Sequence, residues 1–283
     1  MKGYLYLDTS MFPEIVDHLN AERVVDYLVN GPYQVLVSAY NLIEVVVDGN
    51  VGRRDRTLRL MDTLRGGRLP LAFPRDLLHR SLEAYLAGTD YTPHLDENDE
   101  VLCLLDPAAI NTSAIESCTR WKACQEQSFQ DRQSSGRQPL QEALKTAPAE
   151  ERDRLQNNSN ALIEFYCKYE EFLDRQVRPF IKRLGFDEGA QSRAVEIVRE
   201  VDPWRFFLEA QAQAIACRGL KPSRYGKRAN PGPIDFNQLV YFAGCDVLVT
   251  ADKALYREAR IMASRHTGKQ AWDLRGLDRE TNS

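Results

Sequence analysis

The stretch Asp246-Val247-Leu248-Val249-Thr250-Ala251-Asp252 is the most informative part of the sequence. Its centre, Val247 to Thr250, is aliphatic and β-branched, which is typical of a short strand buried inside a parallel sheet. The run ends close to an acidic residue, Asp252, and a helical pattern follows from about Ala254 to Ser264. Ligands of parallel α/β sheets bind beyond the carboxyl ends of the strands, so Asp252 is a candidate site residue.

The N-terminal part of the chain has the same arrangement. Tyr4-Leu5-Tyr6-Leu7 is a short apolar run that ends on Asp8. A second apolar run, Val35-Leu36-Val37, is followed by Ser38, which is well suited to cap a helix, and Glu44 falls in the first two turns of that helix. Strands therefore alternate with helices, which predicts an α/β fold with a parallel sheet flanked by helices.

Two further segments could add strands to this sheet. Pro70 to Phe73 is expected to form a third strand, and Trp272 is expected to belong to a last short one. A helix from Asp235 to about Ala243, ended by Gly244, precedes the strand that begins at Val247.

The middle of the chain has a different pattern. Residues 141–175 and 188–219 are rich in Ala, Glu, Gln, Leu and Arg at helical spacing, whereas Ser128 to Pro139 is expected to be a loop. We therefore expect an α/β core formed by residues 1–89 and 230–283, interrupted by a mainly helical insertion at residues 90–229.

Composition limits the class of protein. The chain has 283 residues, of which 43% are hydrophobic and 28% charged, with a formal net charge of −4. No apolar run is long enough for a membrane span or a secretory signal, so we expect a cytoplasmic protein. The six cysteines contain no Cys-x-x-Cys pair and the four histidines are scattered, which gives little support to a disulfide framework or a His-based zinc site.

Four carboxylates occupy related places in this pattern: Asp8, Glu44, Asp235 and Asp252. In a doubly wound sheet all four could meet at one rim, with Asp235 further out than the other three. Two like charges about 5 Å apart repel by roughly 3 kcal/mol at an effective dielectric constant near 20, so such a cluster requires a cation or shifted pKa values. Oxygen ligands favour Mg²⁺ or Mn²⁺, which can activate water for phosphodiester hydrolysis.

The sequence resembles the PIN-domain family. The resemblance lies in Leu7-Asp8-Thr9-Ser10, in Ser38 to Glu44, in Asp235 with its helix and Gly244, and in Asp246 to Asp252, and it covers about residues 1–85 and 231–275. It implies a metal-dependent ribonuclease in which Asp8, Glu44, Asp235 and Asp252 bind or orient Mg²⁺ or Mn²⁺. It further implies that Thr250 orients Asp252 or a water, and that Ser10 and Asn237 donate hydrogen bonds behind these acids. An inhibitory or operon-partner protein is a further expectation.

Basic residues are clustered in two places. Residues 52–68 carry six arginines against two aspartates. The second cluster lies just before Asp235 and consists of Lys221, Arg224, Lys227 and Arg228, with Tyr225 among them. Cations there could neutralise phosphates and the tyrosine could stack on a base, so we expect the second cluster to bind RNA; either cluster could instead be a solvated face.

Two other functions remain open from the sequence. The first is a catalytically weak PIN-like module that binds RNA or a partner protein; retention of all four acids argues against it. The second is an α/β phosphatase that uses Asp8 as its nucleophile. Such enzymes commonly carry a second aspartate two residues later, where this chain has Ser10. The RNA sequence is not specified, and DNA is not excluded as a substrate.

Overall fold

The computed structural model describes residues 2–18, 20–157, 159–168, 170–219 and 232–282. The strands are β1 (Gly3–Leu7), β2 (Tyr33–Leu36), β3 (Val247–Val249) and β4 (Gln270–Trp272). The α-helices are α1 (Met11–Val16), α2 (Ala21–Asn30), α3 (Ala39–Val46), α4 (Val51–Arg65), α5 (Pro74–Ala87), α6 (Thr112–Thr146), α7 (Ala149–Asn157), α8 (Ser159–Lys168), α9 (Glu170–Arg183), α10 (Glu188–Ser192), α11 (Ala194–Glu200), α12 (Asp202–Gly219), α13 (Pro233–Gln238), α14 (Lys253–Ala263) and α15 (Leu274–Glu280). Three 3₁₀ helices complete the set within the described ranges: η1 (Glu100–Leu105), η2 (Pro107–Ala109) and η3 (Leu239–Ala243).

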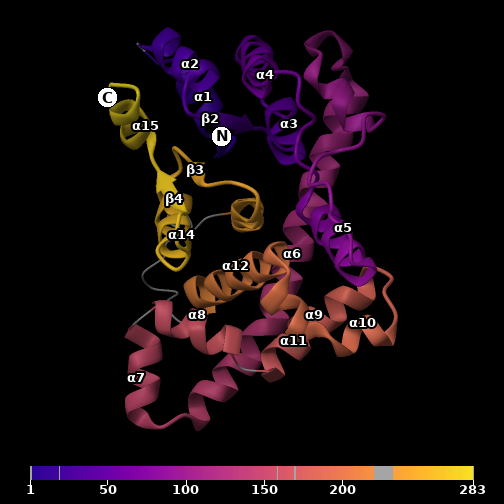
Figure 1. The fold of residues 1–283 in the computed structure, drawn as a ribbon, viewed down its shortest axis with the longest axis vertical. Helices are drawn as coiled ribbons and strands as arrows, with labels where there is room; N and C mark the ends of the chain where they lie inside the picture. The colour runs from indigo at the N-terminus through magenta and orange to yellow at the C-terminus, as the bar shows by residue number, and fades with distance from the viewer. Residues whose placement is uncertain (1, 19, 158, 169, 220–231, 283) are drawn as a thin grey trace. The chain divides into compact units, whose positions relative to one another are not determined.

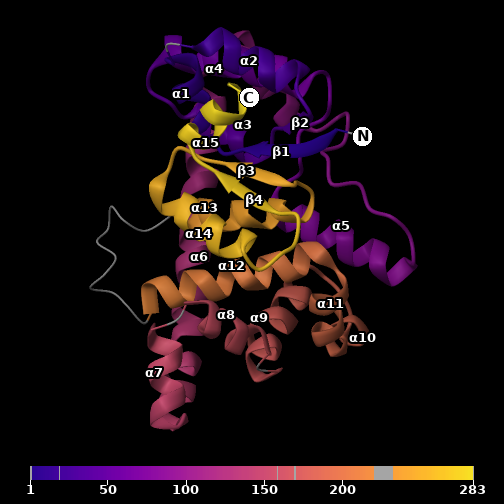
Figure 2. The same cartoon turned by 60° about the vertical axis from the view of Figure 1, so that its left-hand side comes forward.

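The four strands form one parallel sheet in the order β2-β1-β3-β4, and β1, β3 and β4 can be followed side by side in Figure 2. Leu5 on β1 pairs with Val35 on one side and with Val247 on the other, which places the N-terminal and C-terminal parts of the chain in the same sheet. The predicted α/β fold with a parallel sheet flanked by helices is confirmed.

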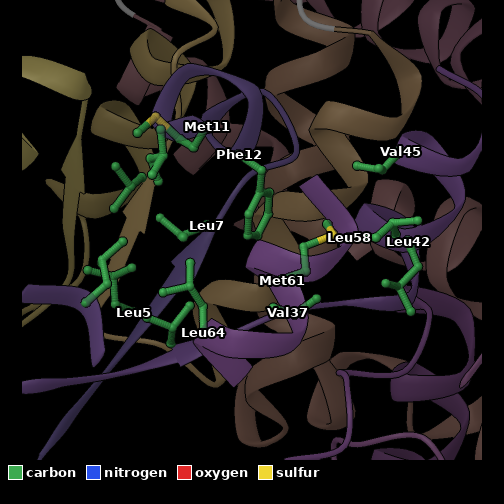
Figure 3. Close-up of a cluster of buried hydrophobic side chains, with 14 of the residues drawn as sticks. Leu5, Leu7, Met11, Phe12, Val37, Leu42, Val45, Leu58, Met61 and Leu64 are labelled. Atoms are coloured by element: carbon green, nitrogen blue, oxygen red, sulfur yellow. The ribbon is translucent and has the colours of Figure 1, made fainter. Parts of the chain in front are cut away.

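The central strands are apolar, which allows both of their faces to be covered by other parts of the chain. All three residues of β3 are buried, as are Leu5, Tyr6 and Leu7 of β1. Figure 3 shows how side chains from β1, α1, α3 and α4 gather in one cluster, among them Met11, Phe12 and Leu58, all fully buried. Each such side chain contributes roughly 1.5–3 kcal/mol relative to an exposed one, so the cluster holds the sheet and these helices in a fixed arrangement.

The predictions for two local segments were wrong. Pro70 to Phe73 is not a regular strand; only Leu71 pairs, through single bridges to Ser38 and His94. Ser128 to Pro139 is not a loop but lies inside α6, since helix-forming residues on both sides propagate the helix through it. The rest of the predicted insertion is mainly helical where the structure describes it, and those residues contain no strand.

The chain divides into two compact units. Unit 1 consists of residues 1–77, 92–125 and 244–283, and contains the whole sheet. Figure 1 labels β2, β3 and β4 of this sheet and colours the chain by residue number. Unit 2 consists of residues 78–91 and 126–243 and is built around α12, which packs against α8, α11, α13 and η3. Its core includes Trp204, whose indole N–H donates to the Leu78 carbonyl oxygen at 3.0 Å and whose ring contacts Phe180 and Phe207. Among the described residues no helix has the length and hydrophobicity needed to cross a membrane.

Candidate active site at the carboxyl ends of the central strands

Asp8 is the first residue after β1 and is held beside β3. Its backbone N–H donates to the Val249 carbonyl oxygen at 2.9 Å, so the main chain is still paired at the point where the acid begins. The side chain is only 2% exposed. The strand pairing therefore places a buried carboxylate where β1 and β3 end together.

Two hydroxyl groups bind one oxygen of this carboxylate. Ser10 Oγ and Thr250 Oγ1 donate to Asp8 Oδ2 at 2.5 and 2.8 Å. Ser10 Oγ also accepts the backbone N–H groups of Ala251 and Asp252, at 3.0 and 3.2 Å. Both hydroxyl groups and the Ser10 backbone N–H bind Asp8 Oδ2, so the carboxylate is fixed in place through this oxygen.

Glu44 comes to the same end of the sheet on α3. Ser38 caps this helix by accepting the Asn41 N–H, while the Asn41 side chain accepts the Ser38 N–H at 2.8 Å. Thr9 Oγ1 donates to Glu44 Oε2 at 2.7 Å, which joins the helix to the residue directly after Asp8. The Glu44 side chain is 14% exposed.

A buried polar network fixes α3 on β1 beneath these acids. The Asn41 amide donates to Thr9 Oγ1 at 3.0 Å and to Tyr6 Oη at 3.2 Å, and Tyr6 Oη contacts Ser38 Oγ at 3.0 Å. Every group in this network is buried or half-buried and paired, so the network specifies the position of the helix. Glu44 is thereby held on the same side of the sheet edge as Asp8.

Burial raises the pKa values of both acids, and the Asp8 charge raises that of Glu44 further. Burial is the main cause at Asp8, and the hydrogen bonds from Ser10 and Thr250 offset part of it. At Glu44 burial also raises the pKa most, the Asp8 charge raises it further, and Lys122 and Thr9 lower it. An acid whose pKa is raised by burial and by a neighbouring acid is typical of functional sites and of sites that bind cations.

The Asp252 side chain has a helix-capping role in this structure. Its Oδ1 accepts the N–H groups of Ala254 and Leu255 at 2.6 and 2.8 Å at the start of α14. Its own N–H donates to Thr250 Oγ1 at 3.0 Å. Thr250 thus supports the Asp8 carboxylate and the Asp252 backbone, rather than the Asp252 carboxylate. The capping bonds use Oδ1 and leave Asp252 Oδ2 outside them.

Asp235 and Asn237 lie on α13 in unit 2. The Asp235 carboxylate accepts the Gly232 N–H as part of the N-terminal cap of this helix, and Asn237 is buried. Their proximity to Asp8 stays a prediction. The expected RNA-binding residues Lys221, Arg224, Tyr225, Lys227 and Arg228 lie outside the described residues.

The donors at this site fit a hard divalent cation in kind. All are carboxylate oxygens, and Asp8 and Asp252 each have a second oxygen beyond the one that the hydroxyl or capping groups bind. Asp8 and Glu44 are brought together, whereas no group of three or more His, Cys, Asp or Glu side chains in the described part of the chain is gathered closely enough to hold a metal ion. Mg²⁺ commonly needs only one or two protein carboxylates, with water and substrate completing its shell.

The arginine-rich stretch at residues 52–68 is largely neutralised by local ion pairs. Arg53, Arg54, Arg56 and Arg65 pair with Asp48, Asp55, Asp17 and Asp62, respectively. This pairing favours a solvated face over a phosphate-binding track. A pocket of about 710 Å³ lies at its C-terminal end, lined by Arg59, Asp62, Thr63, Arg65, Leu69, Leu102, Leu105, Asp106 and Pro107.

Several residues around the acids were not identified from the sequence. Thr9 and Asn41 could have been found, since Thr9 adjoins Asp8 and Ser38-x-x-Asn41 has the spacing of a capping box. Lys122 donates to Glu44 Oε1 at 3.3 Å. This contact could not be predicted from the sequence, because the two residues are 78 positions apart.

No protein-family model, curated protein or solved structure matches this chain.

Proposed function

We propose that the protein is a Mg²⁺- or Mn²⁺-dependent endoribonuclease of the PIN type, with its catalytic centre at Asp8 and Glu44. The observation that carries this proposal is the buried Asp8 carboxylate at the end of β1, with the half-buried Glu44 carboxylate close enough for the Asp8 charge to raise its pKa. Sites of parallel α/β sheets lie at this edge, and such a pair gains stability when a cation binds between its members. Several reactions are possible at such a site, and the resemblance of the sequence motifs to the PIN-domain family favours RNA hydrolysis among them.

The residues have separate roles in this proposal. Asp8 and Glu44 would hold the cation, with Asp252 as a further carboxylate of the same unit, and the role of Asp235 stays a prediction from the sequence. Ser10 and Thr250 keep Asp8 in one rotamer by binding its Oδ2, and Thr9 does the same for Glu44 Oε2. When bound, Mg²⁺ or Mn²⁺ supplies an activated water and neutralises charge that develops on the phosphate.

The test is cleavage of end-labelled RNA by purified protein in Mn²⁺ or Mg²⁺, with EDTA as the metal-free condition. Wild type is expected to cut only with metal, and Glu44→Gln and Asp8→Asn are expected to lose roughly a hundredfold or more in rate. Asp17→Asn is the matched control, because Asp17 is an exposed acid of the same unit that pairs with Arg56. Equal cleavage by wild type and both site variants would contradict the proposal.

The ends of the products give a second readout. Attack by water leaves no cyclic phosphate, whereas attack by the RNA 2′-hydroxyl produces a 2′,3′-cyclic phosphate. We therefore expect linear phosphate and hydroxyl termini from this protein. Cyclic products would indicate a different mechanism, and parallel assays with single-stranded DNA show whether the 2′-hydroxyl is needed at all.

A second candidate function is a binding module of the same fold without catalysis. It is favoured by one observation: the described acids do not gather as a set of three. Such a module would bind RNA equally well with and without divalent metal and would leave it intact. The cleavage assay therefore distinguishes the two functions.

A further inference from the structure

Lys122 places a cation in the acid site. Its Nζ lies 3.3 Å from Glu44 Oε1, and its side chain is 34% exposed against 14% for Glu44. Thr9 donates to Glu44 Oε2, whereas Lys122 donates to the other carboxylate oxygen, Oε1. Lys122 is thus the more exposed member of the pair and Glu44 the more buried one.

The start of α6 is anchored so that this side chain reaches the site. Trp121 packs against Tyr40 and Phe73, with ring centroids 5.2 and 4.7 Å apart. One turn earlier, Cys118 is part of the buried core cluster. Tyr40 lies one helical turn before Glu44 on α3, so the same contact that docks α6 also sets Lys122 opposite Glu44.

A divalent cation bound to Glu44 would weaken the Lys122–Glu44 pair, because two cations that share one carboxylate repel each other. Lysine is a point charge on a flexible four-carbon stem, so its ammonium can turn aside while Trp121 stays docked. An RNA phosphate bound at the site would give the displaced ammonium group a new anionic partner.

We propose that Lys122 is a substrate-positioning residue whose ammonium exchanges Glu44 for a phosphate oxygen of the bound RNA strand. This inference rests on the proposed ribonuclease function. In the free protein Lys122 shields the acid pair; in the complex it holds the strand over that pair. Two opposite effects follow from its removal: weaker binding of RNA and tighter binding of metal.

The experiment compares wild type, Lys122→Ala, Lys122→Arg and Arg120→Ala. Arg120 is the matched control, since it is an exposed cation two residues earlier on α6, about 200° around the helix. Three quantities are measured: apparent KM and kcat for RNA across a salt titration, Mn²⁺ affinity by calorimetry without RNA, and the thermal unfolding midpoint.

For Lys122→Ala the apparent KM is expected to rise about tenfold, with a salt slope smaller by about one unit. Its Mn²⁺ affinity is expected to rise about two- to fivefold, the size of a partly exposed ion pair. Lys122→Arg should restore most of the KM, and Arg120→Ala should resemble wild type in all three measurements.

Each of the following results would overturn the role of Lys122, and the last would overturn the ribonuclease function as well. If wild type cleaves RNA while Lys122→Ala keeps its KM and salt slope, the role of Lys122 is overturned and the ribonuclease function stands. If Arg120→Ala raises the apparent KM as much as Lys122→Ala does, the effect is general electrostatic attraction of RNA. The specific positioning role of Lys122 is then overturned. If wild type does not cleave with either metal, both proposals fail together. Unfolding midpoints close to wild type show that these effects are not due to unfolding.

Discussion

At the scale of single residues, Asp8 is the group on which the site depends most. It is buried at the end of β1, two hydroxyl groups bind its Oδ2, and its neighbour Glu44 has the same charge. A carboxylate in this setting lowers the stability of the fold when it is ionised. Proteins commonly accept such a cost at sites where binding of a ligand later offsets it.

Asp8→Asn should therefore stabilise the metal-free protein at neutral pH. The amide oxygen can still accept the hydrogen bonds of Ser10 and Thr250, while the buried charge is removed. We expect a gain of roughly 0.5–2 kcal/mol in the free energy of unfolding, measured by urea denaturation in EDTA.

The gain should depend on pH in a defined direction. The folded protein raises the pKa of Asp8 above the unfolded value near 4, so the folded state holds more protons between these two pKa values. Wild-type stability falls as pH rises through that window, whereas Asp8→Asn does not titrate there. The difference should thus shrink as pH falls toward about 4. A difference that is constant with pH, or a loss of stability at neutral pH, would contradict the assigned environment of Asp8.

At the scale of elements, the start of α6 brings Lys122 to Glu44, and this position could not be predicted from the sequence. Asp8 and Thr250 could be placed from the sequence because each directly follows or ends a short apolar run, and parallel strands bring such ends together. Lys122 could not, since its place depends on how Trp121 docks on Tyr40 and Phe73.

The same distinction explains the strand predictions. Val247 to Val249 could be predicted as a strand because a short, uninterrupted apolar run is typical of a strand covered on both faces. All three residues are buried in the structure. Leu71 pairs with Ser38 and His94 only through single bridges, and no local pattern distinguishes such a bridge from a strand. Likewise, the capping role of Asp252 and the acid role predicted for it share one sequence pattern, an acid after a strand.

Trp121→Ala should release the start of α6 from the rest of unit 1. Trp121 is half-buried, so we expect the free energy of unfolding to fall by roughly 1.5–3 kcal/mol, below the range for a fully buried aromatic side chain. Trp121→Phe keeps most of the ring packing and should be much closer to wild type. The measurement is urea unfolding together with the apparent KM for RNA. If Trp121→Ala is as stable as wild type, the anchor assigned to this aromatic cluster is wrong.

At the scale of the whole molecule, RNA must reach an acidic site on a chain with a net charge of −4. Most arginines of the stretch at residues 52–68 are already paired with aspartates, which leaves the sequence near Asp235 as the better candidate for the RNA path. Its residues Arg224 and Arg228 lie outside the described residues, so this assignment rests on the sequence.

Replacing Arg224 and Arg228 together by alanine should raise the apparent KM for RNA while kcat changes little. The salt slope should decrease by about one unit for each phosphate that the variant no longer binds. The assay is RNA cleavage across a salt titration, with Arg53→Ala as the control, because Arg53 is paired with Asp48. Wild-type behaviour of the double variant at every salt concentration would show that this segment does not hold RNA.

Binding of a divalent cation by Asp8 and its neighbours is the property on which all the proposed roles depend. Calorimetric titration of Mn²⁺ into the purified protein measures that property without any assumption about the substrate. We predict saturable binding by wild type and by Asp17→Asn, and at least about tenfold weaker binding by Asp8→Asn. Absence of binding by wild type at millimolar Mn²⁺, or equal affinity in wild type and Asp8→Asn, would contradict the proposed metal site.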